Sequence, residues 1–202
     1  MFKEKPTDQR SERMEEKIKA RIMDAIKIRR VLARIATEVI ERNRNLKNVV
    51  IVGVKTRGIA IGKRIARLVK DLEGADIPVG FLDITHYRDD MPASPAKGGP
   101  KTAKLAFSVV KKDVLLVDDV LMTGRTIRAA MDALIDRGRP RTVQLFVFID
   151  RGHRELPIEP DYVGKVLPTS RRETVRVRLK EMDGTDEVLI AEPLRLAARA
   201  KR

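Results

Sequence analysis

The apolar residues of this chain fall into two kinds of run, and each kind predicts one type of element. A continuous apolar run is typical of a strand buried on both faces of a sheet, and one lies at 49–52. Mainly apolar stretches that also predict strands lie at 78–84, 113–117 and 143–149. Apolar residues three or four positions apart are typical of helices; this spacing is found over 24–44, 58–72 and 126–137. Strands and helices alternate along the chain, so we predict a parallel α/β sheet with right-handed crossovers.

Polar residues and glycines mark where the predicted helices begin and end. Asp24 is placed as the N-cap of the first helix, and Asn43 together with Asn45 marks its end. Gly74 and Gly138 follow the second and third helices, as helix-terminating glycines commonly do.

Three stretches do not fit this alternation. Residues 1–19 carry charges without apolar periodicity and residues 192–202 form a basic tail, so both are predicted to be extensions of one domain over 20–191. Residues 86–104 hold three prolines and two glycines among few apolar residues, which predicts a lid loop or a disordered segment. Shorter strand-like runs occur at 20–23, 162–166, 175–179 and 188–191.

The charge balance narrows the range of functions. Lys and Arg number 43 against 29 Asp and Glu among 202 residues, so the formal net charge is +14. Such an excess favours polyanionic partners, either nucleic acid or phosphorylated small molecules, although a densely charged surface of the thermophile kind would give a similar total. The chain has no cysteine, which excludes disulfides and thiolate chemistry, and two histidines, which argue against a zinc enzyme.

Nothing in the sequence predicts a membrane protein. No apolar run approaches about 18 residues, and the charged first 21 residues are unlike a signal peptide. With 43% hydrophobic residues the chain can form a core. We therefore expect a cytoplasmic globular protein that binds no membrane.

The most informative stretch runs from Val114 to Thr126, where an apolar strand leads into two acids, a small polar loop and a helix. Asp118 and Asp119 stand at the carboxyl end of the strand, which is the edge at which parallel sheets bind ligands. Adjacent carboxylates there suit the two neighbouring hydroxyls of a ribose. The loop Thr123–Thr126 offers backbone N–H groups and hydroxyls to a phosphate, and its glycine permits a close approach.

This string resembles the phosphoribosyl-pyrophosphate (PRPP) motif of type I phosphoribosyltransferases. The resemblance implies that Asp118 and Asp119 hold the ribose of PRPP and act in catalysis. The other residues that it implies to bind PRPP or nucleotide here are Val120, Leu121, Met122, Thr123, Gly124, Arg125 and Thr126. A second loop between a strand and a helix is implied to hold the pyrophosphate through Thr56 and Arg57. Mg²⁺ is implied to arrive with PRPP, without a dedicated set of protein ligands.

Further strings are similar to those of the PyrR family of pyrimidine-operon attenuators. They lie at 83–90, 150–158, 161–165 and 168–170, and the resemblance covers 22–191. It implies a type I phosphoribosyltransferase-like α/β fold with a small β hood, mainly 150–191, and a flexible lid loop over 86–104. It also implies two activities: conversion of uracil and PRPP to UMP and pyrophosphate, and binding of pyrimidine-operon mRNA that depends on UMP or UTP. The implied assembly is a homodimer, or a tetramer or hexamer built from dimers.

The resemblance assigns further residues to the nucleotide site. Arg88 in the lid loop is implied to contact the leaving group during catalysis; a salt bridge within the loop is the alternative. Arg151 is implied to reach the nucleotide from the hood, and Val175 to line the base pocket through its backbone. Met122 cannot take the proton that purine-type enzymes pass to an acid at this position, and it also replaces the tyrosine usual in the family.

The first predicted helix carries a basic stripe that is a candidate RNA surface. Arg30, Arg34 and Arg42 lie along one side of it, and basic helix faces can follow a sugar–phosphate backbone. His153 and Arg154 are implied to add RNA contacts from near the hood. A solvated helix face and a structural turn at His153 are the alternatives.

Two positions in this helix depart from the family. Ala33 and Thr37 stand where PyrR proteins commonly have threonine and histidine, so RNA recognition is expected to be altered. Two other functions therefore stay open. One is a non-catalytic regulator that senses PRPP or a nucleotide and binds RNA, and the other is a salvage phosphoribosyltransferase with no RNA role.

Overall fold

The computed structural model describes residues 16–54, 56–84, 87 and 103–193. In chain order the elements are β1 (Glu16–Met23), α1 (Ala25–Arg42), η1 (Leu46–Asn48), β2 (Val49–Val54), α2 (Arg57–Glu73), β3 (Val79–Leu82), β4 (Ala103–Lys104), β5 (Asp113–Leu121), α3 (Arg125–Ile135), β6 (Thr142–Asp150), β7 (Tyr162–Val166), β8 (Thr174–Arg178), α4 (Lys180–Asp183) and β9 (Glu187–Pro193). None of the helices in the described residues is both long and apolar enough to span a bilayer.

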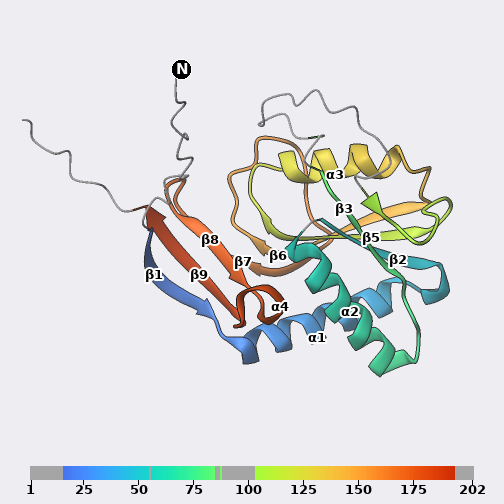
Figure 1. Cartoon of the computed structure of the whole chain (residues 1–202), viewed down its shortest axis with the longest axis horizontal. Coiled ribbons are helices and arrows are strands. Elements are labelled where there is room, and N and C mark those ends of the chain that lie inside the picture. Colours follow the sequence, from blue (N-terminus) through green and yellow to red (C-terminus); the bar gives the residue numbers. More distant parts are fainter. Residues whose placement is uncertain (1–15, 55, 85–86, 88–102, 194–202) are drawn as a thin grey trace, which may run out of the picture.

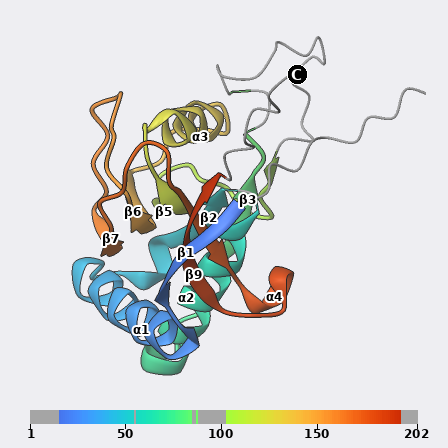
Figure 2. The same ribbon diagram turned by 90° about the vertical axis from the view of Figure 1, so that its left-hand side faces the viewer.

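The larger of two sheets confirms the predicted parallel α/β architecture. Its strand order is β4-β3-β2-β5-β6-β7, and every neighbouring pair is parallel except β3 with β4. Helices α1 and α2 cover one face and α3 covers the other (Figures 1 and 2). Each face has its own apolar core, one with the buried residues of α1 and α2 and one with those of α3. The central strands are therefore buried on both faces, which explains their continuous apolar runs.

The predicted helix ends are confirmed for α1 and α2. The carboxylate of Asp24 accepts from the backbone N–H of Lys27 at 2.8 Å, as an N-cap does. Asn43 is the C-cap of α1, and Gly74 ends α2 in the left-handed region at φ +67°. The third helix ends at Ile135, ahead of Gly138, because Asp136 already serves as its C-cap.

The smaller sheet forms the hood, and it corrects two of the predicted boundaries. Its order is β1-β9-β8, so its first strand comes from the start of the described chain (Figure 2). That strand begins at Glu16, four residues before the predicted start at Ala20, and pairs antiparallel with β9. The early start was missed because most of the strand is exposed and charged, which leaves little apolar signal.

The second correction concerns β7, which was placed in the hood and in fact extends the large sheet beside β6. Gly164 allows this close pairing, because a Cβ there would overlap the carbonyl oxygen of Phe148. Residues 1–15, most of the predicted lid loop and the tail from 194 onward lie outside the described residues.

Candidate active site

The acid pair stands on a strand that runs further than predicted. We expected β5 to end at Val117, but it continues to Leu121 and keeps its register with β6 through the acids. Asp118 is 5% exposed, whereas Asp119 is half-buried at the edge of a cavity. The backbone N–H of Asp119 donates to Oδ1 of Asp118 at 2.9 Å. The sheet itself therefore fixes the direction of both carboxylates.

Burial raises the pKa of Asp119, while hydrogen bonding with Asp118 and the positive charge of Arg57 oppose that rise. A carboxylate in this environment gains from any further donor or cation that reaches it. Ribose hydroxyls and a divalent cation are ligands of that kind.

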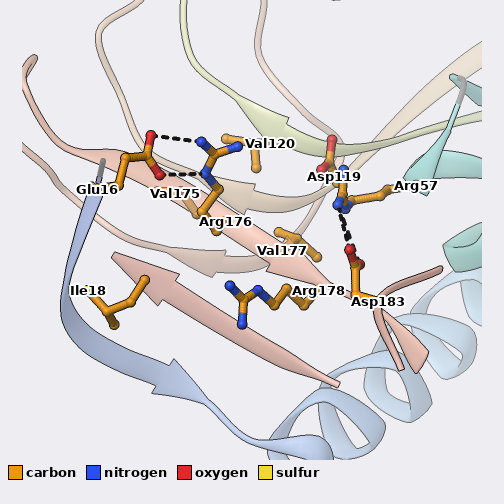
Figure 3. A pocket seen from close by; sticks show the side chains of 10 residues that line it. All are labelled: Glu16, Ile18, Arg57, Asp119, Val120, Val175, Arg176, Val177, Arg178 and Asp183. Atoms are coloured by element: carbon orange, nitrogen blue, oxygen red, sulfur yellow. Dashed lines mark hydrogen bonds and ion pairs between the residues drawn. The ribbon is translucent and has the colours of Figure 1, made fainter. Parts of the chain in front are cut away.

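Two glycines bring the start of α2 against the acid pair. A Cβ on Gly58 would overlap the carbonyl oxygen of Val117, and one on Gly53 would lie 2.5 Å from the backbone nitrogen of Ile59. Only glycine permits so close an approach between the first turn of α2 and strands β2 and β5. Arg57, the first residue of that helix, consequently faces Asp119 (Figure 3).

The loop before α3 has the geometry of an anion site. Gly124 adopts φ +91°, and α3 begins at the next residue, so the N–H groups of the first turn point toward the loop. The carbonyl of Thr123 accepts from Glu155 N at 3.0 Å and from Leu156 N at 3.1 Å, which ties the loop to the segment after β6. The backbone N–H of Arg125 already donates to Oγ1 of Thr123 at 3.3 Å. The other N–H groups of the first turn of this eleven-residue helix are the ones that suit a phosphate.

A cavity of about 890 Å³ joins the acid pair to the hood. Its lining includes four of the residues predicted for the nucleotide site: Arg57, Asp119, Val120 and Val175. The sequence reasoning missed the rest of the lining, which is Glu16, Ile18, Arg176, Val177, Arg178 and Asp183. Figure 3 shows an ion pair at each end, Arg57 with Asp183 and Arg176 with Glu16. A weak polar–apolar alternation over 17–22 was the available signal for a strand at this position.

Arg151 is not among the residues that line this cavity. Its side chain is buried, donating to Oγ1 of Thr169 at 3.0 Å and to the carbonyls of Ser170 at 2.9 Å and Glu173 at 2.7 Å. Burial lowers the pKa of this guanidinium. In this structure Arg151 holds the loop that leads into β8, and so shapes the hood. Arg88 lies outside the described residues.

Two of the three arginines predicted for the RNA surface bind the large sheet. Nη2 of Arg34 donates to the carbonyls of Val163 and Gly164, both at 2.9 Å. Arg42 pairs with Asp161 at 2.6 Å and lies 5.4 Å above the ring of Tyr162. Both side chains remain about half exposed. The side chains of Arg34 and Arg42 therefore lie beside β7. Arg30 stands one turn before Arg34 in α1 and is exposed.

His153 and Arg154 shape the loop after β6. His153 has φ +66°, and its Nε2 lies 2.6 Å from the carbonyl oxygen of Thr169. Arg154 pairs with Asp150 at 2.6 Å and donates to the carbonyl of Met122 at 3.1 Å. Arg154 also lines a second cavity together with residues of β7. Arg34, Arg42 and Arg154 thus lie beside β7, whereas His153 contacts the loop at Thr169 after that strand. The role of these residues and of Arg30 in RNA binding stays a prediction.

The donor set fits a magnesium ion that comes with its substrate. Within the described ranges no group of three His, Cys, Asp or Glu side chains could hold a metal by itself. Mg²⁺ commonly takes one or two carboxylates and completes its shell with phosphate oxygens and water. Asp118 and Asp119 supply carboxylates of that kind beside the cavity.

The fold and the site together define the class of this protein. The family model described as the phosphoribosyl transferase domain matches residues 20–181, and the chain is a phosphoribosyltransferase. The structure of a hypoxanthine phosphoribosyltransferase from Staphylococcus aureus matches with a TM-score of 0.65, over 87% of this chain and 94% of that one. The sequence identity is 18%, so this likeness concerns the fold alone.

Sequence relatives narrow the class to one family. The bifunctional protein PyrR of Pelotomaculum thermopropionicum is 55% identical over 174 residues, which is 86% of this chain and 96% of that protein. The bifunctional protein PyrR of Deinococcus radiodurans is 53% identical over 175 residues, or 87% and 96% of the two chains. The chain belongs to the PyrR family, as its motifs predicted.

Proposed function

We propose that this protein is a regulator of a pyrimidine operon that also converts uracil and PRPP to UMP and pyrophosphate. The regulator binds the operon mRNA when a uridine nucleotide occupies the site, and so attenuates transcription. The observation that carries the catalytic half is the juxtaposition of Asp119 and Arg57 in one cavity, with Asp119 on the strand that leads into the loop at Gly124. One site thus offers carboxylates for ribose, amides for the 5′-phosphate and a guanidinium for the pyrophosphate.

The reaction exchanges one bond at C1′ of the ribose. Uracil N1 forms a bond to C1′, the bond from C1′ to the pyrophosphate oxygen breaks, and the N1 proton is released. Positive charge develops on the ribose while negative charge grows on the leaving group. The protein's contribution is therefore positioning and charge stabilisation. Mg²⁺ carried by PRPP supplies further neutralisation of the pyrophosphate.

The parts of the site divide this work. Asp118 and Asp119 hold the ribose hydroxyls, Thr123 to Thr126 hold the 5′-phosphate, and Thr56 with Arg57 receives the pyrophosphate. Val120 and Val175 give the cavity an apolar wall against which a pyrimidine ring packs. Met122 offers no proton acceptor, which favours a pyrimidine over a purine substrate.

The RNA-binding half rests on charge and on family membership. Exposed guanidinium groups at Arg30, Arg34 and Arg42 suit the phosphates of an RNA loop. Arg154, which lines a cavity with residues of β7, and His153 add further contacts in this proposal. Because Ala33 and Thr37 offer less polar contact than the usual residues, the preferred RNA sequence differs from that of typical relatives. We further propose a cytoplasmic homodimer that can assemble into tetramers or hexamers.

One preparation of the protein tests both halves. Turnover of uracil with PRPP and Mg²⁺ is measured first, and binding of pyrimidine-leader RNA is then measured with and without UMP. We expect turnover that Asp118→Asn and Asp119→Asn each reduce at least about 100-fold, and RNA affinity that rises with UMP and falls with salt. PRPP binding and UMP-dependent RNA binding without turnover would indicate the non-catalytic sensor, and turnover without RNA binding would indicate the salvage enzyme.

A further inference from the structure

Two arginines on one side of α2 reach the turn that follows the hood strand β8. Arg57 and Arg64 are seven residues apart, about two helical turns, so they project in similar directions. Arg64 pairs with Glu181 at 2.5 Å and with Asp186 at 2.7 Å, and the hydrogen bonds that it donates to Glu181 raise the pKa of this guanidinium. This clamp fastens the turn to α2 without any contribution from Arg57.

Asp183 closes the same turn. Its Oδ2 accepts from the backbone N–H of Leu179 at 2.9 Å, and its own backbone N–H donates to the carbonyl of Leu179 at 2.7 Å. The carboxylate therefore has a fixed place, from which Oδ1 accepts from Nη2 of Arg57 at 3.1 Å. In the close-up this pair stands at one end of the cavity, with Asp119 next to the guanidinium (Figure 3).

One donor of the Arg57 guanidinium is buried without a partner in the described part of the chain. Its Nε is buried and has no hydrogen-bond partner among the described residues. A buried N–H without an acceptor is unfavourable, so this group gains when an acceptor enters the cavity. An anionic oxygen is the acceptor that a guanidinium binds most strongly.

We propose that Asp183 is a positioning residue for the transfer reaction, holding Arg57 by Nη2 so that Nε meets the diphosphate oxygens of the substrate. The inference rests on the proposed function, because it takes Arg57 as the ligand of the pyrophosphate. An unpaired arginine must lose side-chain freedom when it binds an anion. Because the carboxylate of Asp183 already restricts Arg57, binding the anion costs less side-chain entropy. Asp183 itself touches no substrate atom.

The experiment compares two charge-removing variants of one short helix. Asp183→Asn removes the charge opposite Arg57 and keeps an oxygen for the N–H of Leu179, whereas Glu181→Gln removes a charge that faces Arg64. Turnover with PRPP and calorimetric binding of inorganic pyrophosphate with Mg²⁺ are measured for both. We expect Asp183→Asn to lower kcat/KM for PRPP and to weaken pyrophosphate binding about three- to fivefold, and Glu181→Gln to change either by less than about twofold.

A double-mutant cycle distinguishes positioning from a structural role. In an Arg57→Gln background, Asp183→Asn should lower kcat/KM and pyrophosphate affinity no further. With Arg57 present, Asp183→Glu should lower both less than Asp183→Asn does, because it keeps the negative charge. An equal effect of Asp183→Asn with and without Arg57, or tighter pyrophosphate binding by that variant, would overturn the inference. If the unmodified protein shows no turnover, the proposed function fails, and the pyrophosphate titration still decides the role of Asp183.

Discussion

The guanidinium of Arg34 donates to the carbonyl oxygen of Gly164 at 2.9 Å and so ties the middle of α1 to β7, the edge strand of the large sheet. The same nitrogen reaches the carbonyl of Val163, and Nη1 pairs with Glu38 at 2.5 Å. A residue placed in the RNA surface on sequence grounds therefore also has a structural role. The two roles separate in experiments that measure stability and RNA affinity together.

Arg34→Ala is expected to lower the free energy of unfolding by about 1 kcal/mol, because a half-exposed arginine loses its bonds to two strand carbonyls. Arg30→Ala, one turn earlier, serves as the matched control and should leave the free energy of unfolding within about 0.5 kcal/mol of the native value. Urea denaturation gives both values. If the two variants are equally stable, the α1–β7 bonds contribute nothing measurable.

RNA binding is the second measurement, and Arg30→Ala is its cleaner variant because its stability is expected to stay unchanged. If the α1 stripe binds phosphates, Arg30→Ala should weaken RNA binding and reduce the steepness of its salt dependence while stability stays unchanged. Binding to leader RNA is followed over a range of salt concentrations. An unchanged affinity and slope would remove Arg30 from the RNA surface.

The parallel sheet, its helices and the turn at Gly124 before α3 were predictable from the sequence because each depends on local chemistry. Apolar runs mark the central strands, Asp24 caps its own helix, and Gly124 sets its own backbone. The far wall of the cavity was not predictable, because Glu16 and Asp183 reach it only through long-range pairing of the hood. The same holds for Arg151 and Arg34. The sequence shows their charge, but it does not show which backbone carbonyls they bind, because those carbonyls come from distant segments.

Asp113 gives the fold a pH dependence at the amino end of β5. Burial alone would raise the pKa of Asp113, but hydrogen bonds from Arg141, Thr142 and Asn48 outweigh it, and the pKa lies below its ordinary value of 3.8. Because the folded state favours the charged form, this carboxylate stabilises the protein fully above pH 3.8. The contribution is lost as the pH falls below that value.

Asp113→Asn should therefore destabilise the protein by about 1–3 kcal/mol at neutral pH, and the gap to the native protein should close as the pH falls below 3.8. Urea denaturation between pH 3 and 7 measures this difference in the free energy of unfolding. Asp76→Asn, at an exposed position paired with Lys70, is the control and should show little difference at any pH. If the stability difference between Asp113→Asn and the native protein did not change with pH, the charge of Asp113 would not be what stabilises the fold.

Gly58 tests the approach of α2 to the acid pair. A methyl group there would overlap the carbonyl oxygen of Val117, so Gly58→Ala must move the first turn of α2 and Arg57 with it. We expect a cost of about 1–3 kcal/mol in stability and at least a tenfold loss of turnover, since small displacements in an active site are costly. On the same helix, Gly62→Ala would bring a Cβ to 2.8 Å from Cγ2 of the buried Ile51 and to 3.7 Å from Val79. It should therefore also cost stability, but it meets no backbone of β5 and should retain most of the activity.

Metal removal should affect the chemistry and not the fold. Because the described part of the chain holds no cluster of three metal-binding side chains, EDTA should abolish turnover without changing the Tm of the protein alone. Added Mg²⁺ should restore turnover in proportion to the Mg²⁺–PRPP complex formed. A lower Tm in EDTA would indicate a resident structural ion instead.

The hood has its middle strand, β9, encoded last among the described strands, while one neighbour, β1, is encoded first. During synthesis β1 is made first but cannot pair until β9 has left the ribosome. All strands of the large sheet, β2 to β7, are made before β9. Native contacts of such long sequence separation form late. A nascent chain therefore lacks the wall that carries Glu16 and Ile18, and its cavity is complete only after β9 has been translated.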